Sequence, residues 1–438
     1  MLYRKIEKLI EEHLKSDTQK ILLIDGARQV GKTYIIRYVG QRLFENFIEI
    51  NMVEDSIGDR LFANTKTIED FYLQVSMIAG NKMKAKSDTL IFIDEIQAYP
   101  HLLTLLKFLS QDNKFTYIAS GSLLGVTLSQ TTSIPIGSIR KVRMYPLDFE
   151  EFLYANGMNE FVISAVQNKF KELQSLDENM HNKMMDYFQK YLLIGGLPDA
   201  VNSYLNEKNI QSVRNIQNET HDYYAADASK YDEEKKLKIR RIYDLIPSNM
   251  ENKKGKTFTD YSDEFEYLIS AGIALNVQAI SNPVFPLIES TGKNLLKLYL
   301  NDVGILTSIL YGNNIRAILD NKSSINLGSV YETVVASELT AHGYKLFYYD
   351  NRSKGEVDYL IDDYNSLSAV PIEVKSGKDY TVHSALNTFV QNEDYHIKKA
   401  FVVSNERKVQ TKGKITYIPI YYIMFFNANS TLENNIEF

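Results

Sequence analysis

The 438-residue sequence contains no cysteine, which excludes disulfide bonds, thiol catalysis and zinc sites with cysteine ligands. Its seven histidines are scattered and lack the close pairing of a metal-binding motif. Proline is also scarce, at nine residues, and 44% of the chain is apolar, as in folded proteins rather than collagenous or disordered ones. Any catalysis must therefore rest on side chains other than thiols.

Long apolar runs are missing as well. No segment reaches the roughly 18 uninterrupted apolar residues that a membrane-spanning helix needs. The first residues, MLYRKIEKLIEEHLK, have the pattern of an amphipathic helix and not of a signal peptide. We therefore expect a cytoplasmic protein without a membrane partner. The net charge of -6 disfavours a strongly basic nucleic-acid-binding coat, while a local groove can still be positive.

The order of apolar patterns predicts an α/β protein of three parts. Over residues 1–155, short apolar runs alternate with amphipathic stretches, which indicates a parallel sheet covered by helices. The pattern of residues 156–320 is mostly helical and includes a small helix-plus-strand module. Residues 321–438 start with a helix and continue with segments rich in β-branched and aromatic residues, which indicates a separate α/β domain.

Two helix ends are predicted from local sequence. Asp148 is expected to cap the helix DFEEFLYA, with Glu151 as its partner in a capping box. Gly343 is expected to terminate the helix LGSVYETVVASELTAHG, because glycine readily takes the left-handed conformation that follows a helix.

A glycine-rich segment, GARQVGKT, follows the first apolar strand and fits the pattern G-x-x-x-x-G-K-[ST] at every fixed position. Its glycines let the backbone curl so that N–H groups point inward, and the helix that follows adds its positive end. We expect the loop to bind ATP, with the catalytic Lys32 on the β- and γ-phosphates and the Thr33 hydroxyl on Mg²⁺. The expected nucleotide contacts are Gly26, Ala27, Arg28, Gln29, Val30, Gly31, Lys32 and Thr33.

Two acids end a later apolar strand, TLIFIDEIQ. Asp94 is expected to hold Mg²⁺ through its waters, and Glu95 to act as the general base on the attacking water. Both lie at the sheet edge where open α/β sheets bind ligands. Together with the loop, they predict ATP hydrolysis.

Further polar residues are candidates for the same site. Ser120 or Ser122, at the tip of the next strand, can hydrogen-bond the γ-phosphate or the water, or can belong to a plain turn. Arg28, inside the loop, is a candidate for a positive charge on the nucleotide. Arg140 and Arg143 are candidates to reach the nucleotide of a neighbouring subunit, or to pair with surface acids.

A second cluster is predicted near the carboxyl end of the chain. The segments GEVDYLI and PIEVK have the alternation of two strands, and antiparallel pairing would bring Asp358, Glu373 and Lys375 together. Two such carboxylates bind a hard divalent ion, and the ammonium can orient a water or stabilise charge on a phosphodiester. Glu332, on the preceding helix, is a further candidate ligand. The alternative is a solvated hairpin face with a surface ion pair.

Alternation also makes a prediction about the other side chains of the first strand. Glu356 and Asp358 should share one face, and Val357, Tyr359 and Ile361 should occupy the opposite one.

Nearly the whole chain resembles a large family of bacterial and archaeal AAA-type ATPases fused to a C-terminal domain of unknown function with a restriction-endonuclease-like fold. The resemblance is carried by GARQVGKT, TLIFIDEIQ, YIASGSLLG, IPIGSIRKVRMYPLDFEEFL, YLLIGGLPDAV, GEVDYLI and PIEVKSG. It implies an AAA-type P-loop ATPase domain over residues 1–155, a helical lid and winged-helix-like linker over residues 156–320, and a PD-(D/E)XK nuclease-like domain over residues 321–438.

The resemblance also implies roles for single residues. In the nucleases, an acidic pair, a catalytic lysine and a helix acid correspond to Asp358, Glu373, Lys375 and Glu332 of this chain, with Mg²⁺ at the acids. In relatives of the ATPase a basic residue often follows the glycine at Gly137; here Ser138 follows it, which leaves Arg140 as the substitute arginine finger. Residues 325–438 contain 11 Lys plus Arg and 14 Asp plus Glu, so another surface would have to attract nucleic acid.

The expected function is ATP binding and hydrolysis, with Mg²⁺, in which the nucleotide state controls the nuclease-like domain and DNA or RNA is the partner. One alternative is an ATP-dependent regulatory or recognition protein whose nuclease-like fold is catalytically inactive. Another is a signalling ATPase that assembles into a homo-oligomer when ATP binds.

Overall fold

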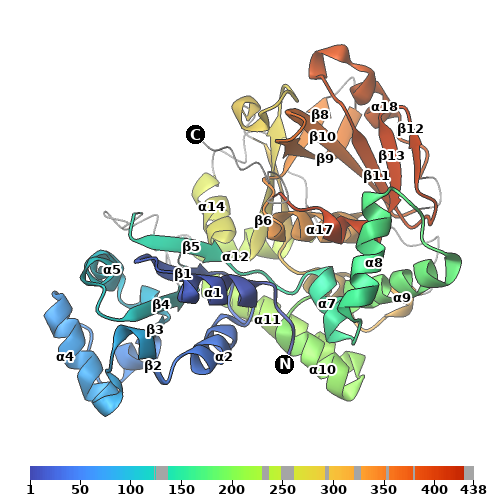
Figure 1. Cartoon of the computed structure of the whole chain (residues 1–438). Helices are drawn as coiled ribbons and strands as arrows, with labels where there is room; N and C mark the ends of the chain where they lie inside the picture. The colour runs from blue at the N-terminus through green and yellow to red at the C-terminus, as the bar shows by residue number, and fades with distance from the viewer. Residues whose placement is uncertain are drawn as a thin grey trace. The chain divides into compact units, whose positions relative to one another are not determined.

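The computed structural model describes residues 1–122, 124, 137–228, 236–247, 261–291, 295–319, 327–351, 355–377 and 380–428 (Figure 1). The chain divides into two compact units. The N-terminal unit comprises Arg4–Tyr145 and Ser270–Gly272, and the C-terminal unit comprises Met1–Tyr3, Pro146–Ile269 and Ile273–Phe438. Among the described helices, none combines the length and the apolar character that a membrane crossing requires.

The N-terminal unit is built on a parallel sheet of five strands in the order β2-β3-β4-β1-β5. The strands are β1 (Ile21–Asp25), β2 (Asn46–Asn51), β3 (Thr89–Asp94), β4 (Thr116–Gly121) and β5 (Ile139–Arg143). The helices are α1 (Ile6–Lys15), α2 (Lys32–Leu43), α3 (Met52–Ile57), α4 (Ile68–Ala79) and α5 (Pro100–Asp112).

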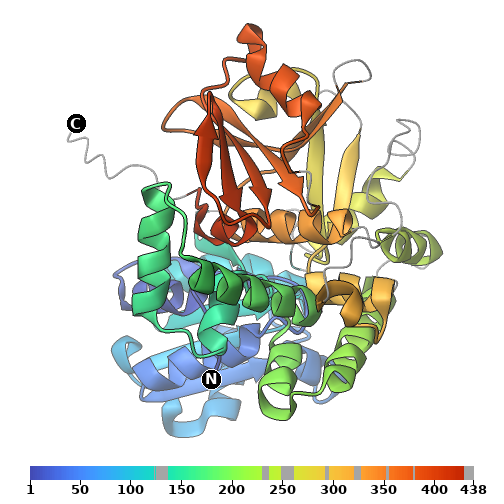
Figure 2. The ribbon, with the colours of Figure 1, turned by 90° about the vertical axis from the view of Figure 1, so that its right-hand side faces the viewer.

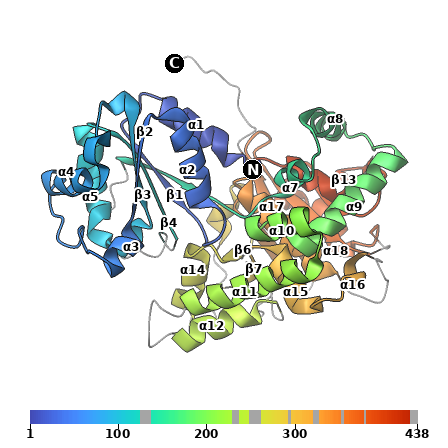
Figure 3. The same ribbon diagram turned by 90° about the horizontal axis from the view of Figure 1, so that it is seen from below.

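Helices cover both faces of this sheet. Helices α1 and α2 lie on one side, and α3, α4 and α5 lie on the other (Figure 3). Strands β1 and β3 are buried along their whole length because their side chains are apolar on both faces. On the α2 side, Gly40 leaves room for Phe47 and Leu90, which would lie within 3 Å of any Cβ placed there. The predicted parallel sheet under helices is therefore confirmed.

The C-terminal unit holds a mixed sheet of eight strands in the order β12-β13-β11-β10-β9-β8-β6-β7. Its strands are β6 (Ala274–Ile280), β7 (Leu296–Leu300), β8 (Phe347–Asn351), β9 (Gly355–Asp363), β10 (Ser368–Lys375), β11 (Ala400–Ser404), β12 (Gln410–Lys412) and β13 (Ile415–Pro419). Its helices are α7 (Phe149–Ala155), α8 (Glu160–Lys171), α9 (Glu178–Ile194), α10 (Pro198–Glu207), α11 (Ile210–Ala228), α12 (Lys236–Leu245), α14 (Ser262–Ser270, whose last residue falls in the N-terminal unit), α15 (Val303–Tyr311), α16 (Arg316–Leu319), α17 (Gly328–Ala341) and α18 (Ser384–Gln391).

The sheet joins strands from two parts of the sequence. Strand β6 pairs in parallel with β8, and β7 pairs with β6, so the boundary predicted at residue 320 falls between strands of one sheet. Helix α18 packs against one face over the core residues Leu386, Phe389 and Val390. Helix α17 packs against β6, β7 and β10 and lies across the base of the sheet (Figure 2).

The segment IGGLPDAV, from one of the blocks that carry the resemblance, packs against the segment LKLYLNDVGIL. The buried carboxylate of Asp302 accepts hydrogen bonds from the backbone N–H groups of Gly196 (2.6 Å) and Ile305 (3.0 Å). Burial raises the pKa of Asp302 to about 6, although these hydrogen bonds oppose the rise. A Cβ at Gly196 would lie 2.0 Å from the Leu147 carbonyl oxygen, so only glycine fits there.

Both predicted helix ends are confirmed. Asp148 caps α7 and Glu151 completes the capping box, while Gly343 follows α17 with a φ of 90°. The two helices also contact each other, because Glu338 of α17 accepts a hydrogen bond from the Phe149 backbone N–H at 2.7 Å.

We predict that Gly196→Ala destabilises the C-terminal unit by about 1–3 kcal/mol, since the new methyl group must displace backbone atoms. Urea unfolding measures the loss. Gly377→Ala is the matched control because a Cβ there meets nothing within 4 Å. Equal stability of the two variants would contradict the packing described for Gly196.

Candidate nucleotide site and acid–lysine cluster

The loop between β1 and α2 curls as its glycines predict. Gly26 and Gly31 have φ values of 149° and 94°, and Gln29 between them has a φ of 61°. A Cβ at Gly26 would lie 2.3 Å from the Met144 carbonyl oxygen, so a larger residue cannot occupy this position without a backbone shift. The backbone therefore has the bent form that directs N–H groups toward an anion.

Lys32 lies buried inside this loop. Among the described residues, its ammonium donates hydrogen bonds to the carbonyl oxygens of Gly26 (3.0 Å) and Ala27 (2.8 Å). Burial lowers the pKa of Lys32, and the charge of Glu95 is the largest influence in the other direction. Because its partners are neutral carbonyls, the ammonium keeps its positive charge available to an anion in the loop.

Asp94 joins the end of β3 to the loop. Its carboxylate accepts hydrogen bonds from the Thr33 hydroxyl at 2.8 Å and from the Ser120 hydroxyl. Burial raises the pKa of Asp94, while both hydroxyl groups oppose the rise. A hydroxyl and a carboxylate oxygen side by side are ligands that fit Mg²⁺.

Glu95 is fixed more firmly than the sequence suggests. Its φ is 51°, and its Oε2 accepts hydrogen bonds from the Ser122 hydroxyl (3.0 Å), the Ser122 N–H (3.3 Å) and the Gln97 amide. Burial alone would raise the pKa of Glu95, but the hydrogen bond from Gln97 and the charge of Lys32 lower it overall. Gln97 was not predicted, although it stands only two residues after Glu95 in the block TLIFIDEIQ.

Two arginines form hydrogen bonds that connect the loop to other parts of the N-terminal unit. Arg28 donates from Nε to the Ser122 hydroxyl at 3.1 Å, which links the loop to the serine that holds Glu95. The buried Arg4, which sequence reasoning missed, donates to the carbonyl oxygens of Val30 (2.8 Å) and Tyr145 (2.6 Å). No local motif marks Arg4, because its partners lie far away along the chain.

The two candidate arginines on β5 differ in their surroundings. Arg143 donates to the buried carboxylate of Asp25 from Nε (3.1 Å) and Nη2 (2.7 Å), and Lys141 lies 3.2 Å from the same oxygen. Arg140 is exposed. The two alternatives for these arginines were a neighbouring subunit's nucleotide and surface acids. Arg143 pairs with an acid, but this acid, Asp25, is buried and not on the surface.

In the C-terminal unit, β9 and β10 pair antiparallel, as predicted. The register ends where Ile372 stands opposite Tyr359, and Glu373 and Asp358 are the next residues on the two strands. The Asp358 carboxylate accepts a hydrogen bond from the Val374 N–H at 2.8 Å, and Lys375 donates to Glu373 Oε1 at 2.8 Å. Glu373 is 6% exposed, and its other oxygen, Oε2, has no hydrogen-bond partner among the described residues.

The predicted alternation fails at one point of β9. Asp358 and Tyr359 together stand opposite the single residue Tyr348 of β8, and Val357 and Leu360 belong to the same core cluster. The extra residue is a β-bulge, which changes where the neighbouring side chains point. Tyr359 consequently reaches α17, where its hydroxyl donates to the Glu332 carbonyl oxygen at 2.8 Å.

Glu332 joins the cluster from α17. The Tyr299 hydroxyl donates to its Oε2 at 2.9 Å. Burial and the charge of Asp358 raise the pKa of Glu332, and likewise that of Glu373, to about 7. Within the described ranges, however, no group of three or more His, Asp or Glu side chains has the arrangement of a metal site.

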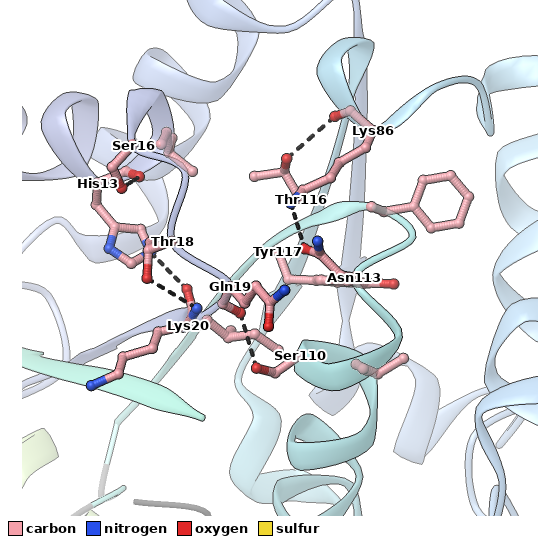
Figure 4. A pocket seen from close by; sticks show the side chains of 14 residues that line it. His13, Ser16, Thr18, Gln19, Lys20, Lys86, Ser110, Asn113, Thr116 and Tyr117 are labelled. Atoms are coloured by element: carbon pink, nitrogen blue, oxygen red, sulfur yellow. Dashed lines mark hydrogen bonds between the residues drawn. The ribbon is translucent and has the colours of Figure 1, made fainter. Parts of the chain in front are cut away.

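A separate cavity of about 30 Å³ lies at the other end of the N-terminal sheet, where β1 and β4 begin. Its polar lining includes His13, Lys20 and Ser110, whose hydroxyl donates to the Gln19 carbonyl oxygen at 2.9 Å (Figure 4). That volume has room for only about one or two ordered waters. Because the loop between β1 and α2 lies at the opposite, carboxyl ends of the strands, the cavity is not part of the candidate nucleotide site.

Comparisons with known families divide the chain into three matched regions. Residues 18–153 match the AAA domain family. The N-terminal part of the chain is an AAA-type P-loop ATPase domain. Residues 185–315 and 327–423 match two domains of unknown function, DUF8612 and DUF4143. Since those families carry no assigned activity, the restriction-endonuclease-like fold stays a prediction.

Several solved structures are similar at low identity. The Walker-type ATPase PABY2304 of Pyrococcus abyssi is 15% identical, over 71% of this chain and 96% of its own, with a TM-score of 0.42. The Aeropyrum pernix ORC1 protein in complex with DNA is 14% identical, over 73% and 94%, with a TM-score of 0.31. AMPPCP-bound DnaA from Aquifex aeolicus is 13% identical, over 59% and 72%, with a TM-score of 0.28. Among curated proteins, no sequence matches this chain.

We predict that Arg143→Met destabilises the ATPase domain by about 1.5–3 kcal/mol, because it removes two hydrogen bonds to Oδ2 of the buried Asp25 and leaves Lys141 as the cationic partner. Arg140→Met, at an exposed position on the same strand, should change stability by less than about 0.5 kcal/mol. Urea unfolding of both variants tests the difference. Unchanged stability with lost ATP turnover in Arg143→Met alone would point instead to a role at a nucleotide.

Proposed function

We propose that the chain is a Mg²⁺-dependent ATPase whose nucleotide state controls a phosphodiester-cleaving centre at Asp358, Glu373 and Lys375, with DNA or RNA as its substrate. Its ATPase half builds on the AAA domain match. Its nuclease half rests on one observation above all. A carboxylate oxygen of Glu373 is buried without a hydrogen-bond donor, beside a second carboxylate and an ammonium. Such an oxygen is costly unless a cation or a donor satisfies it.

In the ATPase half, the bent loop and Lys32 would bind the β- and γ-phosphates, and Thr33 and Asp94 would hold Mg²⁺. Bound Mg²⁺ would neutralise charge on the phosphates. Glu95 has a lowered pKa and is therefore ionised near neutral pH, in the form that accepts a proton from water. Ser122, which contacts both Glu95 and Arg28, would pass a change in the loop to this base.

A covalent connection supports control of the C-terminal unit by the nucleotide. The chain runs from α14 through Ser270–Gly272, which belong to the N-terminal unit, directly into β6 of the large sheet. Within the N-terminal unit, Arg143 donates to the Ser270 carbonyl oxygen at 2.9 Å and also holds Asp25, the residue before the loop. A shift of the loop would therefore act on the residues that lead into β6.

In the C-terminal half, Asp358 and Glu373 would hold Mg²⁺, with Glu332 as a further ligand. The cation would activate a water and offset charge on the phosphodiester. Lys375, held by Glu373, would stabilise the same charge and orient the phosphate. The restriction-endonuclease-like fold and the PD-(D/E)XK assignment belong to this proposal.

A second candidate is ATP-dependent recognition without cleavage. It is favoured by the acidic balance of residues 325–438, with 11 Lys plus Arg and 14 Asp plus Glu, and by the lack of a three-ligand metal group in the described parts of the chain. ATP-dependent binding of DNA or RNA with no strand scission would support this candidate.

For the ATPase half, we predict that Glu95→Gln reduces hydrolysis at least about 100-fold but leaves ATP affinity close to that of the unaltered chain, since only the proton acceptor is lost. Lys32→Ala should lose both ATP hydrolysis and ATP affinity. Phosphate release and equilibrium nucleotide binding measure the two effects. Glu69→Gln, at an exposed position on α4, is the control. Normal turnover in Glu95→Gln would overturn the assignment of the base.

For the nuclease half, we predict cleavage of some substrate in a mixture of DNA and RNA that depends on Mg²⁺ and ATP. Asp358→Ala and Lys375→Ala should each reduce it at least about 100-fold. Asp394→Ala, an exposed acid of the same unit, should cleave normally. Activity that survives in both cluster variants would exclude this centre, and activity that survives in Lys32→Ala would exclude control by ATP.

A further inference from the structure

A second lysine approaches the acid cluster from outside the segment in which the cluster was predicted. Lys297 lies on β7 and is only 4% exposed. Its ammonium donates to Glu356 Oε1 and lies 4.9 Å from the centroid of the Tyr348 ring. Burying a charged side chain at a sheet edge is costly unless its partners are fixed, so the ion pair with Glu356 is a defined part of the site.

The same strand contacts the cluster at a second point. Tyr299, two residues after Lys297 and on the same face of β7, donates its hydroxyl to Glu332 Oε2 at 2.9 Å. Strand β7 therefore holds one carboxylate of β9 and one of α17. Both of its contacts come from residues 185–315, whereas the acids lie in residues 327–423, so two separately matched regions build one site.

The carboxylates of this site outnumber its ammonium groups. Its charged side chains are the four carboxylates Glu332, Glu356, Asp358 and Glu373, and the two ammonium groups Lys297 and Lys375; a bound cation would hold all four carboxylates in their ionised form. Four negative and two positive charges leave an excess of two negative charges, which one divalent cation neutralises. The buried Glu373 Oε2, which lacks a donor in the described structure, gives that cation an oxygen to bind.

We propose that Lys297 is a positioning residue of this centre, which fixes Glu356 and limits the centre to a single divalent cation. This inference rests on the proposed metal-binding role of Asp358 and Glu373. It assigns Lys297 no contact with substrate. Removal of its charge would raise the excess to three negative charges and free Glu356 as a competing ligand.

Mn²⁺ binding to the full-length chain tests the inference, with free Mn²⁺ counted by electron paramagnetic resonance in the absence of nucleotide. The ion held by this centre is the difference between the unaltered chain and its Asp358→Asn variant, and we expect one. Lys297→Met should bind Mn²⁺ about tenfold more tightly or bind a second ion, because an opposing charge has gone. Lys297→Arg should retain the original binding.

Two further variants separate charge from simple damage to the fold. The double variant Lys297→Met with Glu356→Gln restores the excess of two negative charges, so it should recover the original affinity and single ion even where Lys297→Met alone folds poorly. Lys345→Met, at an exposed position of the same unit, should bind as the unaltered chain does.

The outcomes distinguish the two proposals. Equal Mn²⁺ binding by the unaltered chain and Asp358→Asn would overturn the metal-binding role itself, and the Lys297 inference with it. An Asp358-dependent ion whose affinity and number stay the same in Lys297→Met would overturn only the role of Lys297. A double variant that still binds more tightly than the unaltered chain would also overturn it.

Discussion

The site of the ATPase domain depends on one contact, in which the loop between β1 and α2 lies against the carboxyl ends of β3 and β4. Strand β4 lies between β1 and β3, so the loop after β1, the serines at the end of β4 and the acids at the end of β3 share one sheet edge. The Thr33 hydroxyl, hydrogen-bonded to Asp94, marks where they meet. The loop keeps its shape there because Gly26 leaves room for the Met144 backbone.

Both candidate sites bury charge and must compensate for it. In the ATPase domain, Lys32 is buried among carbonyl oxygens near Asp94 and Glu95, an arrangement that phosphate and Mg²⁺ would complete. In the C-terminal sheet, the carboxylates outnumber the ammonium groups, and one carboxylate oxygen of Glu373 is left without a donor. In both places a buried charged group faces the ligand that would compensate it: phosphate at Lys32, and a divalent cation at the carboxylates.

Local patterns predicted the features that local chemistry determines. The loop, the acids after β3 and the cap at Asp148 follow from residues close together in sequence, and the pairing of β9 with β10 follows from a short turn. The contacts of Arg4, the Arg143–Asp25 pair and Lys297 join residues far apart in sequence, which no local pattern reveals. The bulge at Asp358 and Tyr359 was not predicted, because strict alternation of side chains along a strand does not allow for an extra residue.

The central claim is that this loop, with the acids of β3, binds and splits a nucleoside triphosphate. The most direct test is to titrate the purified full-length chain with ATP and Mg²⁺ and follow bound nucleotide and released phosphate together. The account predicts saturable binding and phosphate release that stops when Mg²⁺ is chelated. Neither bound nucleotide nor released phosphate at any Mg²⁺ concentration would contradict it.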